Sequence, residues 1–258
     1  MSKDRKAVRS LIEERFEKYV KGQKPDLTGY NSGHDGAEGD WLTKKMGLTV
    51  NGKNEPDFQG FEMKKDSPKT TFGDWSPDYA LYLSPKRGVK SALSRSEFLS
   101  IFGSPKEHKE PRKNGRHSWS GEVFPTVKGL NKYGQVMKVE ESGDIKALYF
   151  YESDQRPHKS TLVPKKYQVD NVVLAHWTGE RLRLRLERKF NQLGWFKCLK
   201  DSNGYYSKLQ FGRPINYEDF LKMVVLGDVF CDCGMYDGNA RPYMTWRANH
   251  HIWDYLAE

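Results

Sequence analysis

The chain has 258 residues, of which 36% are hydrophobic and 13% aromatic, so it can bury a core and is not an intrinsically disordered protein. Lysine and arginine outnumber aspartate and glutamate by 43 to 34, and the net charge of +9 favours a polyanionic partner. The sequence shows no secretory signal and no apolar run long enough to cross a bilayer, so we expect a cytoplasmic protein that acts away from membranes.

The first predicted elements are two helices followed by a short strand. Apolar residues recur at helical spacing from Asp4 to Lys21. A shorter helix is predicted from Ala37 to Met46, with Asp35 as a candidate cap and Gly47 at its end. Apolar and polar residues then mix at strand spacing from Pro56 to Lys65, which predicts a strand there.

The middle of the chain is predicted to be sheet, after one helix around Ser94–Phe102. Short runs at Val123–Val127, Gln135–Glu140 and Asp144–Tyr151 are separated by turns that contain Gly or Asn. The segment Lys106–His117 is basic and contains Pro and Gly, which predicts an exposed loop.

The last third alternates helices and strands. Residues 182–190 fit a strand or a helix, and their length and their Leu, Arg and Glu content favour a helix. Asp201–Gly204, between two apolar runs, predicts a β-hairpin of Trp195–Leu199 and Tyr205–Phe211. The remaining predictions are a helix near Tyr217–Val225, strands at Val229–Cys233 and Tyr243–Trp246, and a helix around His250–Leu256. One mixed α/β domain over residues 1–258 is the simplest account.

Three charged residues in the predicted strand carry the chemistry of phosphodiester hydrolysis. Asp57 and Glu62 offer the hard oxygen ligands that Mg²⁺ prefers. Lys64 lies two residues after Glu62, so both project from one strand face, where the Lys64 amino group can orient an attacking water or help to deprotonate it. Gly60 permits the bend that brings Asp57 alongside Glu62. We call Asp57, Glu62 and Lys64 the acid–lysine motif.

An exposed strand with ordinary surface charges would show the same spacing. Pro56 before the first acid, and the apolar residues Phe61 and Met63 at the alternate positions, favour a packed catalytic strand instead.

A second group of residues has the chemistry to read DNA bases. Arginine binds guanine edges in bidentate fashion, and acceptor groups bind the cytosine amino group. The segment from Tyr236 to Arg247 offers Asp237, Asn239, Arg241 and Arg247. Contacts to backbone phosphates are expected from Lys65, Lys69 and the loop Lys106–Arg116.

The motifs resemble those of a known nuclease family. Pro56-Asp57 followed by Glu62-Met63-Lys64 resembles the PD-(D/E)XK nuclease signature. Residues 36–42 and 46–48 resemble the helix that precedes this signature in the MvaI/BcnI-like group of type II restriction endonucleases. Weaker similarities continue in the same order at residues 70–77, 175–177, 205–208 and 227–229.

The resemblance implies an α/β (α+β) fold of the PD-(D/E)XK type, with a central mixed sheet flanked by helices. It implies a monomeric, Mg²⁺-dependent bacterial restriction endonuclease that cuts double-stranded DNA at a short G/C-rich site of the CC-N-GG type. Asp57 and Glu62 would bind metal, Lys64 would be catalytic, and Arg247 would match an arginine of the recognition segment. The catalytic part would lie around residues 30–80 and the recognition part around 228–250.

The sequence departs from the family pattern at two places. Thr43 stands where the family often has a metal-binding glutamate, and Asp40, on nearly the same helical face, is the candidate replacement, with Glu38 further round. The family's C-terminal segment carries a histidine at the DNA, and Gly234–Asn239 has none. Two alternatives stay open from the sequence: a strand-nicking repair endonuclease on the same scaffold, and a DNA-binding protein without catalysis.

Overall fold

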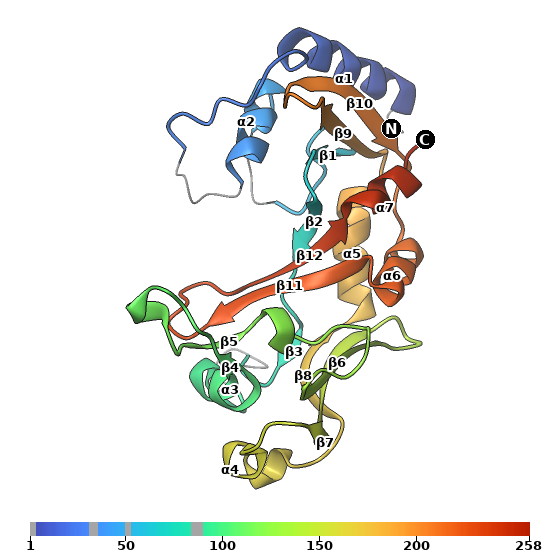
Figure 1. Cartoon of the computed structure of the whole chain (residues 1–258). Coiled ribbons are helices and arrows are strands. Elements are labelled where there is room, and N and C mark those ends of the chain that lie inside the picture. The colour runs from blue at the N-terminus through green and yellow to red at the C-terminus, as the bar shows by residue number, and fades with distance from the viewer. Residues whose placement is uncertain (1–3, 31–35, 50–52, 84–89) are drawn as a thin grey trace. The chain divides into compact units, whose positions relative to one another are not determined.

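The structure is a computed structural model that describes residues 4–30, 36–49, 53–83 and 90–258 (Figure 1). The chain divides into two compact units. The first unit comprises residues 1–70, 184–217 and 249–258, and the second comprises residues 71–183 and 218–248. Each unit is therefore assembled from segments that are far apart in the sequence. The single nuclease domain over residues 1–258 stays a prediction.

A three-stranded sheet of order β1-β9-β10 forms the centre of the first unit. β1 (Phe61–Lys65) runs parallel to β9 (Gly194–Lys200), and β10 (Tyr206–Gly212) runs antiparallel to β9. The pair β9–β10 is the predicted hairpin. The sheet is therefore mixed, with the motif strand β1 at one edge.

One face of this sheet is covered by α1 (Arg5–Tyr19) and α2 (Ala37–Lys45). Asp4 caps α1 by accepting a hydrogen bond from the Lys6 N–H at 3.0 Å. The apolar faces of both helices share one core cluster with Phe61 and Met63 of β1. Its buried members are Val8, Ile12, Phe16, Val20, Trp41, Leu42, Met46, Phe58, Phe61, Met63, Phe196, Cys198, Tyr206 and Phe211.

The other face of the sheet packs against α5 (Gly179–Phe190) and α7 (His250–Tyr255). Trp253 of α7 lies edge-on to Trp195 of β9, with ring centroids 4.9 Å apart, and its ring centroid is 6.4 Å from that of Phe190. Aromatic contacts of this kind bury large apolar surfaces and fix the helices on the sheet.

The second unit contains a five-stranded sheet of order β2-β12-β11-β5-β4 and a four-stranded sheet of order β3-β8-β7-β6. The strands are β2 (Lys69–Asp74), β3 (Tyr79–Ala80), β4 (Ser104–Pro105), β5 (His117–Trp119), β6 (Tyr133–Val139), β7 (Ile145–Asp154), β8 (Val172–Trp177), β11 (Val229–Tyr236) and β12 (Tyr243–Asn249). The helices are α3 (Arg95–Phe102), α4 (Lys159–Leu162) and α6 (Tyr217–Leu226), with 3₁₀ turns η1 (Pro111–Lys113), η2 (Gly121–Val123) and η3 (Lys165–Tyr167).

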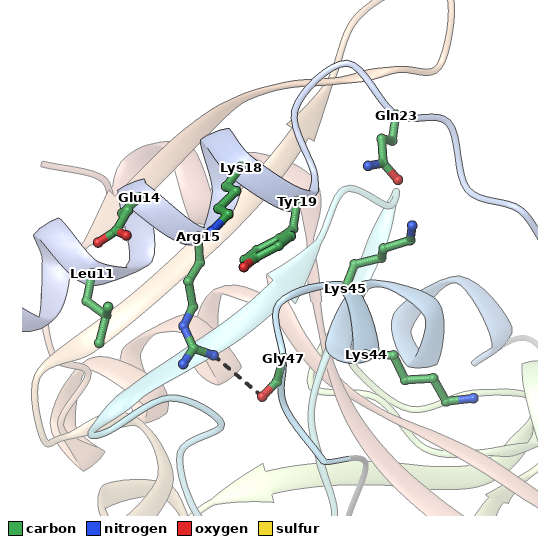
Figure 2. Close-up of a pocket in the computed structure, with 9 residues that line it drawn as sticks. All are labelled: Leu11, Glu14, Arg15, Lys18, Tyr19, Gln23, Lys44, Lys45 and Gly47. Atoms are coloured by element: carbon green, nitrogen blue, oxygen red, sulfur yellow. Dashed lines mark hydrogen bonds between the residues drawn. The ribbon is translucent and has the colours of Figure 1, made fainter.

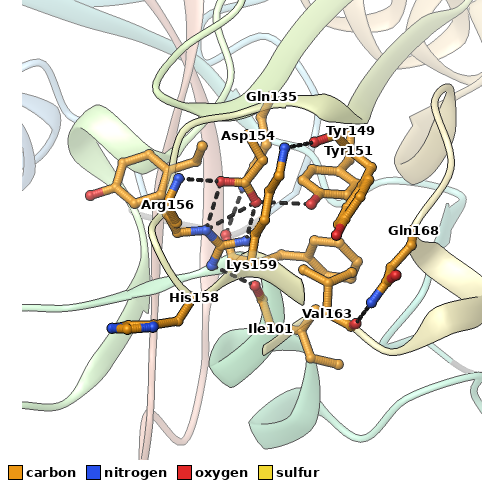
Figure 3. A network of polar contacts seen from close by, with 12 residues as sticks. Ile101, Gln135, Tyr149, Tyr151, Asp154, Arg156, His158, Lys159, Val163 and Gln168 are labelled. Atoms are coloured by element: carbon orange, nitrogen blue, oxygen red, sulfur yellow. Dashed lines mark hydrogen bonds and ion pairs between the residues drawn. The ribbon is translucent and has the colours of Figure 1, made fainter. Parts of the chain in front are cut away.

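A buried carboxylate holds together a polar network in the second unit (Figure 3). Asp154 Oδ2 accepts hydrogen bonds from Arg156 Nη2 at 2.7 Å and from the Tyr149 hydroxyl at 2.8 Å. Arg156 Nε donates to Asp154 Oδ1 at 3.0 Å, and Nη1 donates to the Ile101 carbonyl at 2.8 Å. Burial opposes ionisation of Asp154, but its bonds with Arg156 hold the pKa of the carboxyl below its ordinary value.

Most predicted elements are confirmed, with ends shifted by a few residues, and the fold is mixed α/β as expected. The predicted strand Val123–Val127 is wrong. Residues 121–123 form η2, and Thr126 makes an isolated bridge to Gly129. Pro125 has no N–H to donate to a strand ladder, which disfavours a strand at this position.

One further prediction is confirmed only in part, and another falls on a residue that the structure does not describe. The strand predicted over Pro56–Lys65 begins only at Phe61, because a turn precedes it. The candidate cap Asp35 lies outside the described residues. Within the described part of the chain, every helix is too short or too polar to cross a membrane.

Candidate active site

A tight turn leads from Asp57 into β1. Phe58 and Phe61 exchange both backbone hydrogen bonds, at 2.8 Å each, around Gln59 and Gly60. Both central residues have positive φ, 48° at Gln59 and 108° at Gly60, as two-residue hairpin turns of the primed types require. The bend predicted at Gly60 is confirmed, and it reverses the chain so that Asp57 lies beside the strand it precedes.

The turn places the first acid of the motif against the backbone of the strand. Asp57 Oδ2 accepts a hydrogen bond from the Met63 N–H at 3.0 Å. Met63 is flanked by Glu62 and Lys64, so this bond brings Asp57 next to both. The odd spacing between the two acids is thereby compensated by the turn.

Glu62 and Lys64 lie on the face of β1 opposite the core cluster, because successive strand residues alternate in direction. Lys64 Nζ donates to Glu62 Oε1 at 2.6 Å. Both side chains are buried, with exposed fractions of 9% for Lys64 and 1% for Glu62. The structure thus brings the acid–lysine motif together in a site with little access for bulk water.

A second lysine, which the sequence analysis missed, contacts the same carboxylate. Lys189 of α5 lies with Nζ 3.0 Å from Glu62 Oε1, the oxygen that Lys64 also contacts. Within the described residues, the other oxygen, Glu62 Oε2, is buried and has no hydrogen-bond partner. A buried carboxylate oxygen without a partner costs free energy, and it marks a place where a further cation would be stabilised.

Burial and mutual repulsion shape the electrostatics of the motif. Burial, and next the negative charge of Glu62, raise the pKa of Asp57 to about 6. Burial also lowers the pKa of Lys64 from its ordinary value, against the attraction of Glu62. A divalent cation at the two carboxylates would offset both the cost of burial and the repulsion from Glu62, which together make Asp57 hard to ionise.

These residues fit a hard divalent cation held by few protein ligands. Mg²⁺ is often bound through one or two carboxylates, with waters and substrate phosphate oxygens completing its coordination, and Asp57 and Glu62 supply that number. No group of three or more His, Cys, Asp or Glu side chains among the described residues is arranged to hold a metal. Asp40 as a replacement metal ligand stays a prediction. Thr43 Oγ1 donates within its own helix, to the Gly39 carbonyl at 2.8 Å.

Glu38 lies in a separate polar cluster on the α2 face of the sheet. Its Oε1 accepts hydrogen bonds from Lys200 Nζ and from the Tyr206 hydroxyl, both at 2.8 Å. Lys65 Nζ is 3.9 Å from Glu38 Oε2, since Lys65 projects to the face opposite Lys64. Glu38 therefore has a structural set of partners of its own and does not join the acid–lysine motif.

A third buried lysine lies beside the motif. Lys197 of β9 is paired with Lys64 in the parallel register, and its side chain is fully buried. Its Nζ is 3.3 Å from Asp66 Oδ1 and 3.0 Å from His250 Nδ1. Lys197, Asp66 and His250 come from three distant segments of the chain, so the sequence alone does not predict that they meet.

The residues predicted to read bases lie on or between β11 and β12 of the second unit. Arg247 forms an ion pair with Asp232 of the neighbouring strand, with Nε 2.9 Å from Oδ2. Asp237 accepts hydrogen bonds from the Ser96 hydroxyl at 3.2 Å and from the His117 N–H at 3.3 Å. The Arg247 side chain is partly exposed, and its guanidinium lies beside the carboxylate of Asp232. A carboxylate is an acceptor of the kind that binds the cytosine amino group.

The two other predicted base-reading residues differ in exposure. Asn239 is buried, and its Nδ2 donates to the Gly234 carbonyl at 3.5 Å, so its side chain shapes the turn between the strands. Arg241 is exposed in that turn. Their roles at DNA stay predictions.

A basic pocket of about 680 Å³ lies between α1 and α2 (Figure 2). Arg15, Lys18, Lys44 and Lys45 are among the residues that line it. Arg15 Nη1 donates to the Met46 carbonyl at 2.8 Å, which fixes its guanidinium at the end of α2. Because α1 and α2 cover the face of the sheet opposite the acid–lysine motif, the pocket is separate from the candidate active site.

Comparisons with known proteins show which family the chain belongs to. The family model described as LlaMI restriction endonuclease matches residues 20–258. The chain is 40% identical, over 258 residues, to the type II restriction enzyme ScrFI of Lactococcus lactis subsp. cremoris, covering 93% of this chain and 94% of that protein. The fold is similar to that of restriction endonuclease MvaI in its complex with cognate DNA, with a TM-score of 0.58 and 14% identity, covering 100% of this chain and 98% of that one.

The family match spans nearly the whole chain and includes both the turn at Gly60 and the acid–lysine motif. The similarity to MvaI, at 14% identity, independently supports the fold. The chain belongs to the LlaMI restriction endonuclease family and is a type II restriction endonuclease.

Proposed function

We propose that this enzyme hydrolyses double-stranded DNA with Mg²⁺ held by Asp57 and Glu62, and that Lys64 is its catalytic lysine. The observation that supports this most strongly is Glu62, a fully buried acid with Lys64 on one oxygen and, among the residues that the structure describes, no hydrogen-bond partner on the other. When bound, a divalent ion would supply Lewis-acid stabilisation of the charge that develops on the scissile phosphate.

The protein groups then have distinct tasks. Asp57, fixed by the Met63 N–H, and Glu62, fixed by the strand, hold their oxygens in a rigid arrangement. Lys64 Nζ lies 2.6 Å from Glu62 Oε1, where the ammonium form orients the attacking water and the neutral amine form can take a proton from it. Burial of the site strengthens each of these interactions, because little bulk water competes for the charges.

We place base recognition in residues 228–250 and the catalytic part around residues 30–80. The proposed target is a short G/C-rich site of the CC-N-GG type. Arg247 and Arg241 have the chemistry for guanine edges, and Asp237 has that for cytosine amino groups. The enzyme acts as a monomer in this proposal, which light scattering of the free protein tests directly.

Incubation of the purified protein with a supercoiled plasmid and Mg²⁺ tests the function. Discrete linear fragments are expected, and sequencing of their ends identifies the target and the bond that is cut. Open circles alone would indicate a nicking enzyme, and an unchanged plasmid would indicate a DNA-binding protein without catalysis. The variant Glu62→Gln should show no cleavage, and it controls for contaminating nucleases.

A further inference from the structure

Two ammonium groups converge on one carboxylate oxygen in the candidate active site. Lys64 Nζ is 2.6 Å and Lys189 Nζ is 3.0 Å from Glu62 Oε1. The acid–lysine motif accounts for Lys64. Lys189 comes from α5, far along the chain, and the function proposed above gives it no task.

The position of Lys189 is fixed by its helix. Asn54 Nδ2 donates to the Arg185 carbonyl of α5 at 2.6 Å, and Arg188 forms an ion pair with Glu55. The segment just before the acid–lysine motif is therefore attached to α5 at successive points. Lys189 is held at the site by these contacts, and it is not a surface lysine that happens to reach it.

The two lysines differ in how easily they can leave Glu62. Lys64 extends from β1 itself and is 9% exposed, between strand and helix. Lys189 is 17% exposed, lies near the end of α5, and has a flexible four-carbon stem. If one of the two ammonium groups leaves Glu62, Lys189 is the better placed to move into solvent, because its side chain is the more exposed.

A divalent ion on the two acids would stand within a few ångströms of both ammonium groups, where repulsion between like charges in a buried site is strong. Without such an ion, the buried Glu62 carboxylate needs a compensating positive charge. Lys64 and Lys189 together supply more positive charge than the single negative charge of Glu62 requires. Metal and Lys189 therefore compete for the same carboxylate.

We propose that Lys189 is a resident counter-ion of Glu62, which neutralises the carboxylate in the metal-free enzyme and withdraws from Oε1 when a divalent ion binds. The proposal rests on the proposed function, because it requires metal binding at Asp57 and Glu62. Lys189 is a positioning residue in this scheme, since it acts through Glu62 and sets the affinity of the site for its ion.

The test measures binding of Mn²⁺ alone, without DNA, by electron paramagnetic resonance of the free ion. We expect Lys189→Met to bind Mn²⁺ about tenfold more tightly than wild type, since removing a competing cation relieves a coupling of ordinary size. The matched control is Lys208→Met, which removes one positive charge from an exposed side chain on β10 of the same sheet and should change the affinity less than about twofold.

Melting temperature provides a second readout. In EDTA, Lys189→Met should melt below wild type, because Glu62 loses a counter-ion. In saturating Mn²⁺ the difference should disappear, since the ion then replaces the ammonium group. Lys189→Gln repeats both measurements with a side chain that stays polar, should Lys189→Met fold poorly.

The outcomes separate the two proposals. Wild-type binding that Glu62→Gln abolishes, together with unchanged affinity in both Lys189 variants, would overturn the role of Lys189 and leave the metal site standing. Absence of any Glu62-dependent Mn²⁺ binding in wild type would overturn both. Tighter binding in the Lys189 variants and in Lys208→Met alike would show a general charge effect and would also overturn the specific role.

Discussion

Two buried carboxylates, one in each unit, have opposite surroundings. Asp154 has both oxygens bonded, by Arg156 and by the Tyr149 hydroxyl, and its pKa is lowered. Glu62 has two ammonium groups on one oxygen, and in the described part of the chain no hydrogen-bond partner on the other. The first arrangement is complete without any ligand, whereas the second leaves a carboxylate oxygen that can accept a further donor or bind a cation.

This contrast shows that burial of a charged group does not by itself identify a functional site. A buried ion pair with every hydrogen bond made stabilises one conformation and leaves nothing for a ligand. A buried acid with an unpartnered oxygen beside a second acid of raised pKa, as at Asp57, stores a cost that ligand binding can remove.

The largest expected effect tests the functional side of the contrast. Lys64→Ala should reduce the rate of plasmid cleavage by about 10³-fold or more, in the range for loss of a proton-transfer group. DNA binding in a gel-shift assay without metal should be retained. Lys208→Ala, which removes an exposed lysine from β10 of the same sheet, serves as control and should cleave normally. Normal cleavage by Lys64→Ala would remove this residue from the catalytic scheme.

The next largest effect tests the Asp154 network, whose role is structural. Arg156→Met should lower the free energy of unfolding by about 3–4 kcal/mol, because it leaves Asp154 charged and buried without its partner. Urea denaturation measures the change. Adding Asp154→Leu should recover part of the loss, since no buried charge then remains. A single variant as stable as wild type would mean that the network contributes little to the fold.

A pH-dependent effect distinguishes the two sites directly. The pKa of Asp57 is raised from an ordinary 3.8 to about 6, so the folded protein binds this proton more tightly than the unfolded chain. Stability of the metal-free protein should therefore fall as pH rises from about 4 to about 6, by at most about 3 kcal/mol. Asp57→Asn should remove that loss.

Chemical denaturation in EDTA at pH 4 and pH 7.5 measures this difference between Asp57→Asn and wild type. The variant should be more stable than wild type at pH 7.5 and similar to it at pH 4. An equal difference at both pH values would show that Asp57 does not ionise at a cost in the folded protein.

The smallest effect concerns Glu38, a carboxylate that the structure satisfies with protein groups. Tyr206→Phe removes the hydroxyl that donates to Glu38 Oε1 and should cost about 1 kcal/mol of unfolding free energy. Tyr205→Phe changes the exposed neighbour and should cost nothing measurable in the same urea experiment. A loss of metal binding in Tyr206→Phe would contradict the separation of Glu38 from the acid–lysine motif.

The sequence by itself determined the local elements and the chemistry of the motif. Helical spacing located α1, length and Leu, Arg and Glu content favoured α5, the polar turn located the β9–β10 hairpin, and Gly60 indicated the bend before β1. These features depend on propensities and periodicities of neighbouring residues, so they can be read from a single chain. Pro125 is a local signal of the same kind, and it argues against the strand predicted at Val123–Val127.

Tertiary structure alone decided which charged groups meet. Lys189, Lys197 and His250 reach the motif strand from segments far along the chain, and Glu38 is drawn away to Tyr206 on the other face. No periodicity encodes such meetings, because they follow from the parallel register of β1 with β9 and from the helices packed on each face of the sheet. Residue types set the possible chemistry, and packing of distant segments set which groups carry it out.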